Sequence, residues 1–375
     1  MTAIYLTGTH LSPSPSINQH EPTFLSRLRH QLALVPAGLR TTQVTHAIQA
    51  EVILAHYLYR AGRVVEARYH SSAAVALALG HRLHKIRAAD GDALSGGGEF
   101  AVTLPPAQDA IEEGERINGF WTVVLLDKVW AAALGMPPTV GNDEMIDTPF
   151  PWDVSGYEQN LVPPGAAYSR TIPKFLSRDQ TAPLGGGGSL AYQLQAVILF
   201  ERASHFAFRQ LDNAAQADYI ALDAHIDELR QILFPLDTLQ TLQLDPRTCM
   251  ITCSLLHLAT LKLHSRFIPD NTAALNKCLG VASNLVATLE KVDMARVLPV
   301  NAITGMLCYL VSQEIIRYLT IIPTLPPASR PLNYPPDRVL AMLTSLTSGM
   351  EIFGADCPLT VSQLAELRGA YSATP

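Results

Sequence analysis

Three side chains that bind soft metal ions stand four residues apart: Cys249, Cys253 and His257. Residues at this spacing lie on one face of an α-helix, so two neighbours could share one zinc ion. The first and the third would lie about 12 Å apart along the helix axis, so one ion cannot bind all three. A core-facing stripe of small side chains explains the same pattern, and we favour it over a metal site.

The acidic run Asn142–Asp147 comes nearest to the spaced aspartates that hold magnesium and diphosphate in all-α terpene enzymes. It lies in Pro- and Gly-rich sequence rather than on a predicted helix wall, so we interpret it as a solvated loop. His81 and His84 are one helical turn apart, beside Lys85, and we interpret them as surface or helix-end residues. The phosphate-binding, dinucleotide-binding, HExxH and GxSxG motifs are missing from the sequence. The sequence therefore predicts no catalytic residue, no metal site and no cofactor in this chain.

The composition favours a globular domain that neither binds nucleic acid nor spans a membrane. The 375 residues are 48% hydrophobic, and 27 basic residues face 33 acidic ones, which gives a net charge of −6. Because neutralising phosphates requires a surplus of Lys and Arg, we expect DNA binding only through another module. The most apolar stretches, Ile117–Leu134 and Asn301–Ile322, carry charged residues in their interiors, so we expect no spanning helix and no membrane partner. The five cysteines form no CxxC pair and suit reduced, buried thiols.

The apolar residues follow a helical period along most of the chain. Gln43–Gly80 has apolar residues at steps of three and four, interrupted at Gly62, which predicts an antiparallel helical hairpin. Ala107–Leu134 predicts a long, mostly buried helix that follows a loop at Asp90–Pro106. Met136–Gly188 is rich in Pro and Gly and predicts a draped surface segment, a linker or partial disorder.

Helical patterning then continues to the end of the chain, over Ser189–Asn213, Ala217–Leu233, Pro246–Phe267, Thr272–Val292, Pro299–Ile322, Pro336–Ile352 and a short piece after Pro358. Strand signals are weak throughout. The predicted fold class is therefore all-α: a multi-helix bundle of antiparallel helical hairpins, with a long Pro/Gly-rich connection near the middle.

Two passages, Ala47–Arg87 and Glu112–Asp153, together resemble the fungal-specific transcription factor domain, also called the middle homology region. The family pattern is an Arg, a Phe-Trp pair and an Asp-Arg pair on one helix, then a small-residue helix end and an acidic stretch that closes near a Trp. The residues that carry the resemblance are Arg116, Phe120, Trp121, Asp127, Leu134, Gly135, Ile146, Asp147, Pro149, Pro151 and Trp152. The resemblance covers about Ile4–Asp153. Lys128 stands where the family usually has Arg, which could weaken a bidentate carboxylate contact.

The resemblance implies a nuclear, regulatory helical domain rather than an enzyme. Such domains restrain activity, receive a small-molecule signal, or join a co-regulator or a second copy of the chain. Zinc and DNA binding belong to the family's six-cysteine cluster module, which is absent from this chain; a chain that had truly lost the module could be cytoplasmic. Residues 1–153 would then be the N-terminal part of the domain, with a truncated start, 154–188 a connection, and 189–375 a C-terminal helical part packing on the first.

Two features of the long helix remain open to more than one interpretation. Phe120, Trp121 and Trp130 could line a pocket between helices, but ordinary core residues are the favoured interpretation. Asp127 stands in an almost wholly apolar setting, and a buried carboxylate must be paired. We therefore expect it to hold a neighbouring Arg or a helix end rather than to face water.

Two other classes of protein fit the same helical pattern. A helical-repeat scaffold would bind peptides in a concave groove, and it predicts stacked hairpins with an open curved surface. An all-α enzyme would need two or more carboxylates that converge in a cavity. The regulatory domain remains the leading interpretation because the recognisable motifs belong to it.

Overall fold

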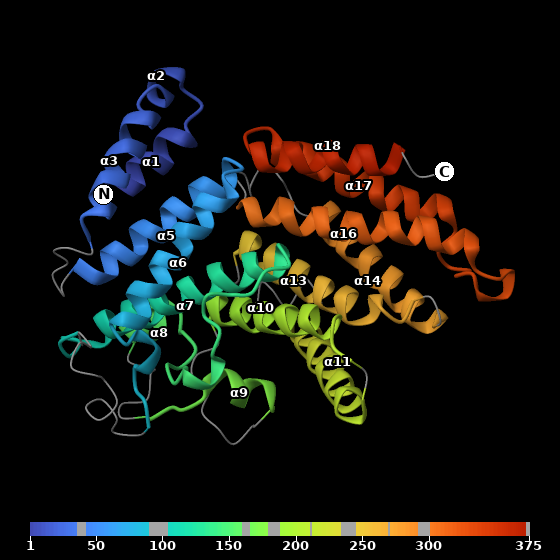
Figure 1. The fold of residues 1–375 in the computed structure, drawn as a ribbon, viewed down its shortest axis with the longest axis horizontal. Coiled ribbons are helices and arrows are strands. Elements are labelled where there is room, and N and C mark those ends of the chain that lie inside the picture. The colour runs from blue at the N-terminus through green and yellow to red at the C-terminus, as the bar shows by residue number, and fades with distance from the viewer. Residues whose placement is uncertain are drawn as a thin grey trace. The chain divides into compact units, whose positions relative to one another are not determined.

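The protein is all-α, as the computed structural model shows (Figure 1). It describes residues 1–35, 43–89, 104–159, 166–178, 188–210, 212–233, 245–268, 271–291 and 301–372. Within these ranges every regular element is a helix, and one isolated bridge joins Ala88 to Tyr168. The predicted fold class is thus confirmed. The predicted loop Asp90–Pro106 lies outside the described residues except for its last three.

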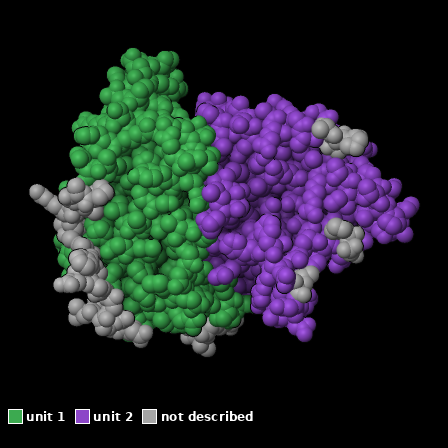
Figure 2. All heavy atoms as spheres, in the orientation of Figure 1, with its two compact units in different colours: residues 1–128, 138–194 green, residues 129–137, 195–375 purple. Residues whose placement is uncertain are grey.

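The chain divides into two compact units (Figure 2). Unit 1 comprises residues 1–128 and 138–194, and unit 2 comprises residues 129–137 and 195–375. The boundaries after residues 128 and 194 fall inside helices, α7 (Ala110–Ala133) and α10 (Ser189–Phe206), and the one after residue 137 follows the end of α7. The division predicted at residues 153 and 188 follows family resemblance and composition rather than packing, and it stays a prediction.

Unit 1 is built around the helical hairpin that the sequence predicts. Its helices α5 (Val44–Arg60) and α6 (Val64–Gly80) pack along each other. The turn between them needs a left-handed residue, which Gly62 supplies with φ +75°. The N-terminal helices α1 and α3 pack on each other and on α5. The other elements of this unit are α1 (Thr2–His10), α2 (Pro15–Asn18), α3 (Glu21–Ala33), η2 (Leu83–Lys85), η3 (Asp143–Met145), α8 (Val154–Glu158) and α9 (Thr171–Leu176).

Unit 2 is a helical bundle in which α16 (Ala302–Ile321) packs against α13, α17 and α18. Side chains at the N-caps begin two of its helices: Asp245 accepts hydrogen bonds from the backbone N–H groups of Arg247 and Thr248, and Asn301 accepts one from that of Ile303. The remaining elements are α11 (Asn213–Leu233), α13 (Pro246–Ser265), α14 (Thr272–Lys291), η4 (Ile322–Thr324), η5 (Pro327–Ser329), α17 (Pro336–Gly354) and α18 (Pro358–Ser372).

One helical stretch, Ala302–Thr324, is long and apolar enough to cross a membrane by length and composition alone, although the sequence led us to expect none. In its most apolar window, 67% is buried inside the protein, and the central helix of a bundle satisfies the same criteria. The acidic residue within this stretch also has a partner of opposite charge in the bundle. Glu314 is buried, and Lys262 lies 3.0 Å from its carboxylate.

The long helix α7 ends as the sequence predicts, at a glycine. Gly135 has φ +64°, and the backbone N–H of Met136 donates to the carbonyl of Ala131 over 2.8 Å. This hydrogen bond satisfies one of the carbonyl groups left free at a helix end, in the manner of a Schellman cap.

Candidate functional site

The segment Asn142–Trp152, called here the motif segment, is held inside unit 1 by hydrogen bonds. Thr148 is fully buried; its hydroxyl donates to the Leu83 carbonyl over 2.6 Å and accepts from the Ile86 N–H over 3.0 Å. The N–H groups of Asp147 and Thr148 both donate to the carbonyl of His84. The prediction of a surface segment, a linker or disorder over Met136–Gly188 is therefore wrong for this part. Its polar backbone tolerates burial because η2 supplies the hydrogen-bond partners.

The carboxylates of the motif segment are paired with cations from other parts of unit 1. Asp147 lies 2.7 Å from Lys85 Nζ and accepts from the backbone N–H of Arg170 over 2.8 Å. Asp143 lies 3.0 Å from Lys128, and Glu144 pairs with the side chain of Arg170. Our interpretation of this run as a solvated loop is wrong for Asp143 and Asp147, which are buried. The three acids face three different cations, so they fasten the chain instead of converging on one magnesium ion.

Aromatic rings fill the space between α7 and the motif segment. The Trp121 indole N–H donates to the Pro149 carbonyl over 2.6 Å, and its ring stacks on Phe150 with centroids 4.9 Å apart. Phe120 meets Trp121 edge-on, and Phe175 of α9 meets Phe150 in the same way. Phe120 and Trp121 are thus core residues of unit 1, and Trp130 is fully buried in unit 2. A pocket-lining role for the three aromatics stays a prediction.

The two adjacent charges of α7 are both buried. Asp127 is 2% exposed and accepts from the backbone N–H of Val140 over 2.8 Å. The burial we expected is confirmed, but the partner is a backbone group beyond the helix rather than an Arg or a helix end. Lys128 is 1% exposed and forms its ion pair with Asp143. A single ammonium suffices here, so the bidentate geometry of Arg is replaced by a point contact.

The remaining motif residues also serve the framework. Arg116 donates to the Glu112 carboxylate and to the Pro105 carbonyl, each over 2.6 Å, next to the first turn of α7. The backbone N–H of Trp152 donates to the hydroxyl of Tyr157 on α8. The Tyr157 ring packs so closely on Gly114 that a Cβ at that position would lie 2.7 Å from it. The residues that carry the family resemblance therefore pack in, or hydrogen-bond around, the core of unit 1.

The cysteine and histidine residues considered as metal ligands have structural partners. Cys249 and Cys253 lie with sulfur atoms 3.6 Å apart, and His257 Nδ1 donates to the carbonyl of Cys253 over 2.6 Å. Burial lowers the pKa of His257 to about 4. Within the described ranges no group of three or more His, Cys, Asp or Glu side chains could hold a metal ion. All five cysteines are buried singly or as this pair, so they do not fit a six-cysteine zinc cluster.

The two histidines after the hairpin differ in their surroundings. His81, at the end of α6, donates from Nδ1 to the Leu77 carbonyl over 2.8 Å, as expected of a helix-end residue. His84 lies in η2 and is buried rather than on the surface. Burial, and then the charges of Lys85 and Arg82, lower its pKa to about 4.

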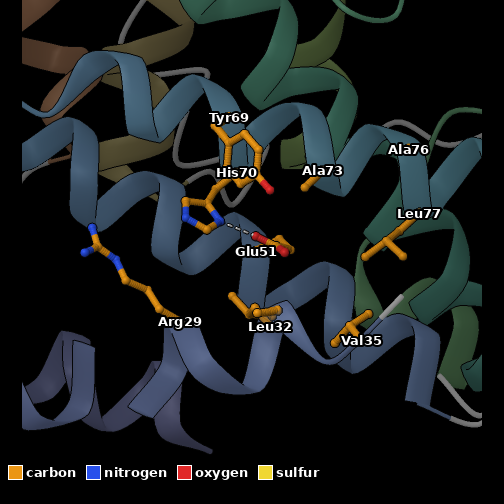
Figure 3. Close-up of a pocket in the computed structure, with 10 residues that line it drawn as sticks. Arg29, Leu32, Val35, Glu51, Tyr69, His70, Ala73, Ala76 and Leu77 are labelled. Atoms are coloured by element: carbon orange, nitrogen blue, oxygen red, sulfur yellow. Dashed lines mark hydrogen bonds and ion pairs between the residues drawn. The ribbon is translucent and has the colours of Figure 1, made fainter. Parts of the chain in front are cut away.

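One pocket in the described part of unit 1 lies among α3, α5 and α6 and has a volume of about 600 Å³ (Figure 3). Most of its wall is apolar, from Leu32, Ala33, Val35, Ala73, Ala76 and Leu77. Glu51 of α5 and His70 of α6 lie next to each other in its wall, with Oε2 and Nδ1 2.6 Å apart. Arg29 and Tyr69 complete the wall. Its volume and its few polar groups are typical of a small-molecule site.

This pocket was not predicted, although the sequence carries one signal of it. Glu51 stands among the apolar residues of the Val44–Tyr59 stripe, where a carboxylate needs a partner. His70 lies 19 residues further on, on the other helix of the hairpin. Only the pairing of α5 with α6 brings the two together.

The helices and the buried motif residues of unit 1 together define a helical domain with its own core. Residues 1–178 match the family described as the fungal specific transcription factor domain. This is a family of transcription factor domains and not an enzyme family. A protein of Kluyveromyces lactis named "Putative transcription factor SEF1" is 28% identical over 137 residues, covering 35% of this chain. The match spans 11% of that relative's length. No solved structure is significantly similar to the chain.

Proposed function

We propose that this chain is the regulatory part of a fungal transcription factor, and that unit 1 controls activity in response to a small molecule. The observation that carries the proposal is the family match over residues 1–178 together with the 600 Å³ pocket inside that same stretch. The signature residues support the same interpretation because they stabilise the body that holds the pocket. Association with a co-regulator or a second copy of the chain belongs to this proposal as the output of the response.

DNA recognition, zinc and nuclear location enter the proposal through a separate module. The net charge of −6 does not favour phosphate binding, and the cysteines do not fit a zinc cluster. We therefore expect no cofactor in this chain and no shift of duplex DNA by the purified protein at physiological salt.

A reporter experiment tests the regulatory role. Residues 1–375 are placed between a heterologous DNA-binding domain and a constitutive activation domain, and reporter output is compared with that of the fusion lacking them. The proposal expects output to change, and it expects Trp121→Ala, which empties the core of unit 1, to abolish the change. Thr139→Val, at an exposed position, serves as the matched control and should behave as the unchanged chain. Equal output with and without the chain would contradict the proposal.

A further inference from the structure

We propose that Cys249 and Cys253 of unit 2 form a dithiol site that binds the arsenic atom of a monosubstituted trivalent arsenical through both sulfur atoms. The proposal goes beyond the regulatory role and does not depend on the pocket of unit 1, because both cysteines lie on α13. It is carried by the distance between the two sulfur atoms, by the number of ligands available and by the position of the pair on its helix.

The distance between the two sulfur atoms suits a single bridging atom. They lie 3.6 Å apart, whereas a disulfide bond would bring them to about 2.05 Å. An arsenic–sulfur bond is close in length to a zinc–sulfur bond, about 2.3 Å. With two such bonds, the observed distance gives an angle of about 100° at the bridging atom, which suits the pyramidal geometry of trivalent arsenic. A linear two-coordinate ion would need the sulfur atoms about 4.6 Å apart.

The number of ligands favours an arsenical over zinc. Structural zinc sites use four protein ligands. His257, one turn further along α13, uses its Nδ1 atom in a hydrogen bond to the Cys253 carbonyl. In the described part of the chain, no third His, Cys, Asp or Glu side chain completes a metal site with the pair. A monosubstituted arsenical needs two thiols only, because its third bond is to carbon.

The two cysteines differ in exposure and in acidity. Cys249 is 5% exposed and directly follows the exposed residues 245–247 and the half-buried Thr248, whereas Cys253 is 1% exposed. A hydrogen bond with Cys253 holds the pKa of Cys249 below its ordinary value, although burial and Asp245 oppose this effect. The same contact, together with burial, raises the pKa of Cys253. Because the thiolate is the nucleophile, Cys249 reacts first and Cys253 closes the bridge.

The reaction is a substitution at arsenic and needs no oxidant. With an arsonous acid, R–As(OH)2, two As–S bonds form and two As–O bonds break. The two thiol protons leave with the two hydroxyl groups as water, and arsenic remains trivalent. Because the second bond forms within one chain, its effective concentration is high, and a pair of thiols binds far more tightly than one thiol.

Phenylarsine oxide, which hydrates to the arsonous acid, tests the inference on the full chain. The reduced chain is titrated in its folded state, and its intact mass is measured. We expect one phenylarsenic group per chain, released again by 2,3-dimercaptopropanol. The loaded chain is then unfolded and alkylated with N-ethylmaleimide, which should label Cys278, Cys308 and Cys357 and spare Cys249 and Cys253. This map uses the unchanged chain, so its outcome does not depend on the folding of any variant.

Two substitutions of equal size locate the binding. Cys253→Ala removes one sulfur atom, so the phenylarsine oxide concentration that modifies half of the chain should rise at least about a hundredfold. Cys308→Ala removes a buried thiol of α16 outside the pair and should react as the unchanged chain does. The inference is overturned if the folded chain takes up no phenylarsenic group, or takes one up only after unfolding in urea. It is equally overturned if N-ethylmaleimide labels the pair in the loaded chain, or if Cys253→Ala reacts as the unchanged chain does.

Discussion

Asp127 and Lys128 are neighbours in sequence, yet each contacts a different point of the chain that follows α7. Asp127 binds the backbone of Val140, and Lys128 binds the side chain of Asp143. Both contacts are buried. Loss of either one would therefore leave a polar group with neither a protein partner nor water. The pair thus fixes the path by which the chain turns back from α7 into the motif segment.

Replacing Lys128 by Ala should lower the free energy of unfolding by about 3 kcal/mol, because it leaves Asp143 as a buried carboxylate without its cation. Urea unfolding followed by circular dichroism measures the change. The double variant Lys128→Met/Asp143→Leu removes both charges and should recover most of the loss. A single variant as stable as the unchanged chain would show that the ion pair does not stabilise the fold.

At the scale of elements, the motif segment and η2 form one hydrogen-bonded assembly although more than 60 residues separate them in sequence. Thr148 is central to it, since its one hydroxyl both donates and accepts. Replacing Thr148 therefore tests whether the assembly depends on these hydrogen bonds or on apolar packing alone.

Thr148→Val keeps the shape of the side chain and loses both hydrogen bonds, so it should cost about 2 kcal/mol of unfolding free energy. The matched control is Thr139→Val, whose hydroxyl contacts Ser72 at the surface and should cost under about 0.5 kcal/mol. Equal losses in the two variants, measured by urea unfolding, would refute this account of the motif segment.

In unit 2, the close approach of α16 and α18 depends on Gly305. A Cβ at this position would lie 2.4 Å from the hydroxyl oxygen of Thr360, which is itself buried. Gly305→Ala should therefore lower the midpoint of thermal unfolding, with a cost of about 1–3 kcal/mol. Thr360→Ala should partly rescue it by making room.

Gly349→Ala on α17 is the control for the helix propensity of alanine. Its added Cβ meets no atom closer than 3.9 Å, so the change should be neutral or stabilising by up to about 1 kcal/mol. If Gly305→Ala changes the midpoint of thermal unfolding no more than Gly349→Ala does, the close packing of α16 and α18 does not require a glycine at position 305.

The sequence predicts elements well and the contacts between distant elements poorly, for a physical reason. The hairpin, α7 and the helices of unit 2 follow from apolar periods of three and four, which are local. The burial of the motif segment depends on hydrogen bonds to Leu83 and His84, and the pocket depends on Glu51 meeting His70. Contacts between residues far apart in the chain produce no periodic pattern in a single sequence. The family resemblance identified the right residues without giving their partners.

At the scale of the whole molecule, stability should fall in mild acid because each unit contains a buried neutral histidine. Burial lowers the pKa of His84 in unit 1 and of His257 in unit 2 from 6.5 to about 4. Between these values the unfolded chain binds protons that the folded chain does not, so unfolding is favoured as pH falls. Each histidine contributes up to about 3 kcal/mol to the loss.

Urea midpoints measured from about pH 7.5 to about pH 4.5 test this prediction. Stability should be level above pH 6.5, the ordinary histidine value, and should decline below it. His84→Gln should flatten the decline in proportion to its share. A midpoint that rises with acidity would contradict the assignment.

The division of α7 between the two units bears on where the folded body ends. Residues 129–137 lie within the family-matched stretch 1–178 yet belong to the unit completed by residues 195–375. If the chain after residue 178 were replaced by that of another protein, residues 129–137 would have to pack against unfamiliar C-terminal helices. The C-terminal helices and the end of α7 therefore belong to one packing unit, and the folded body does not end where the family-matched sequence ends.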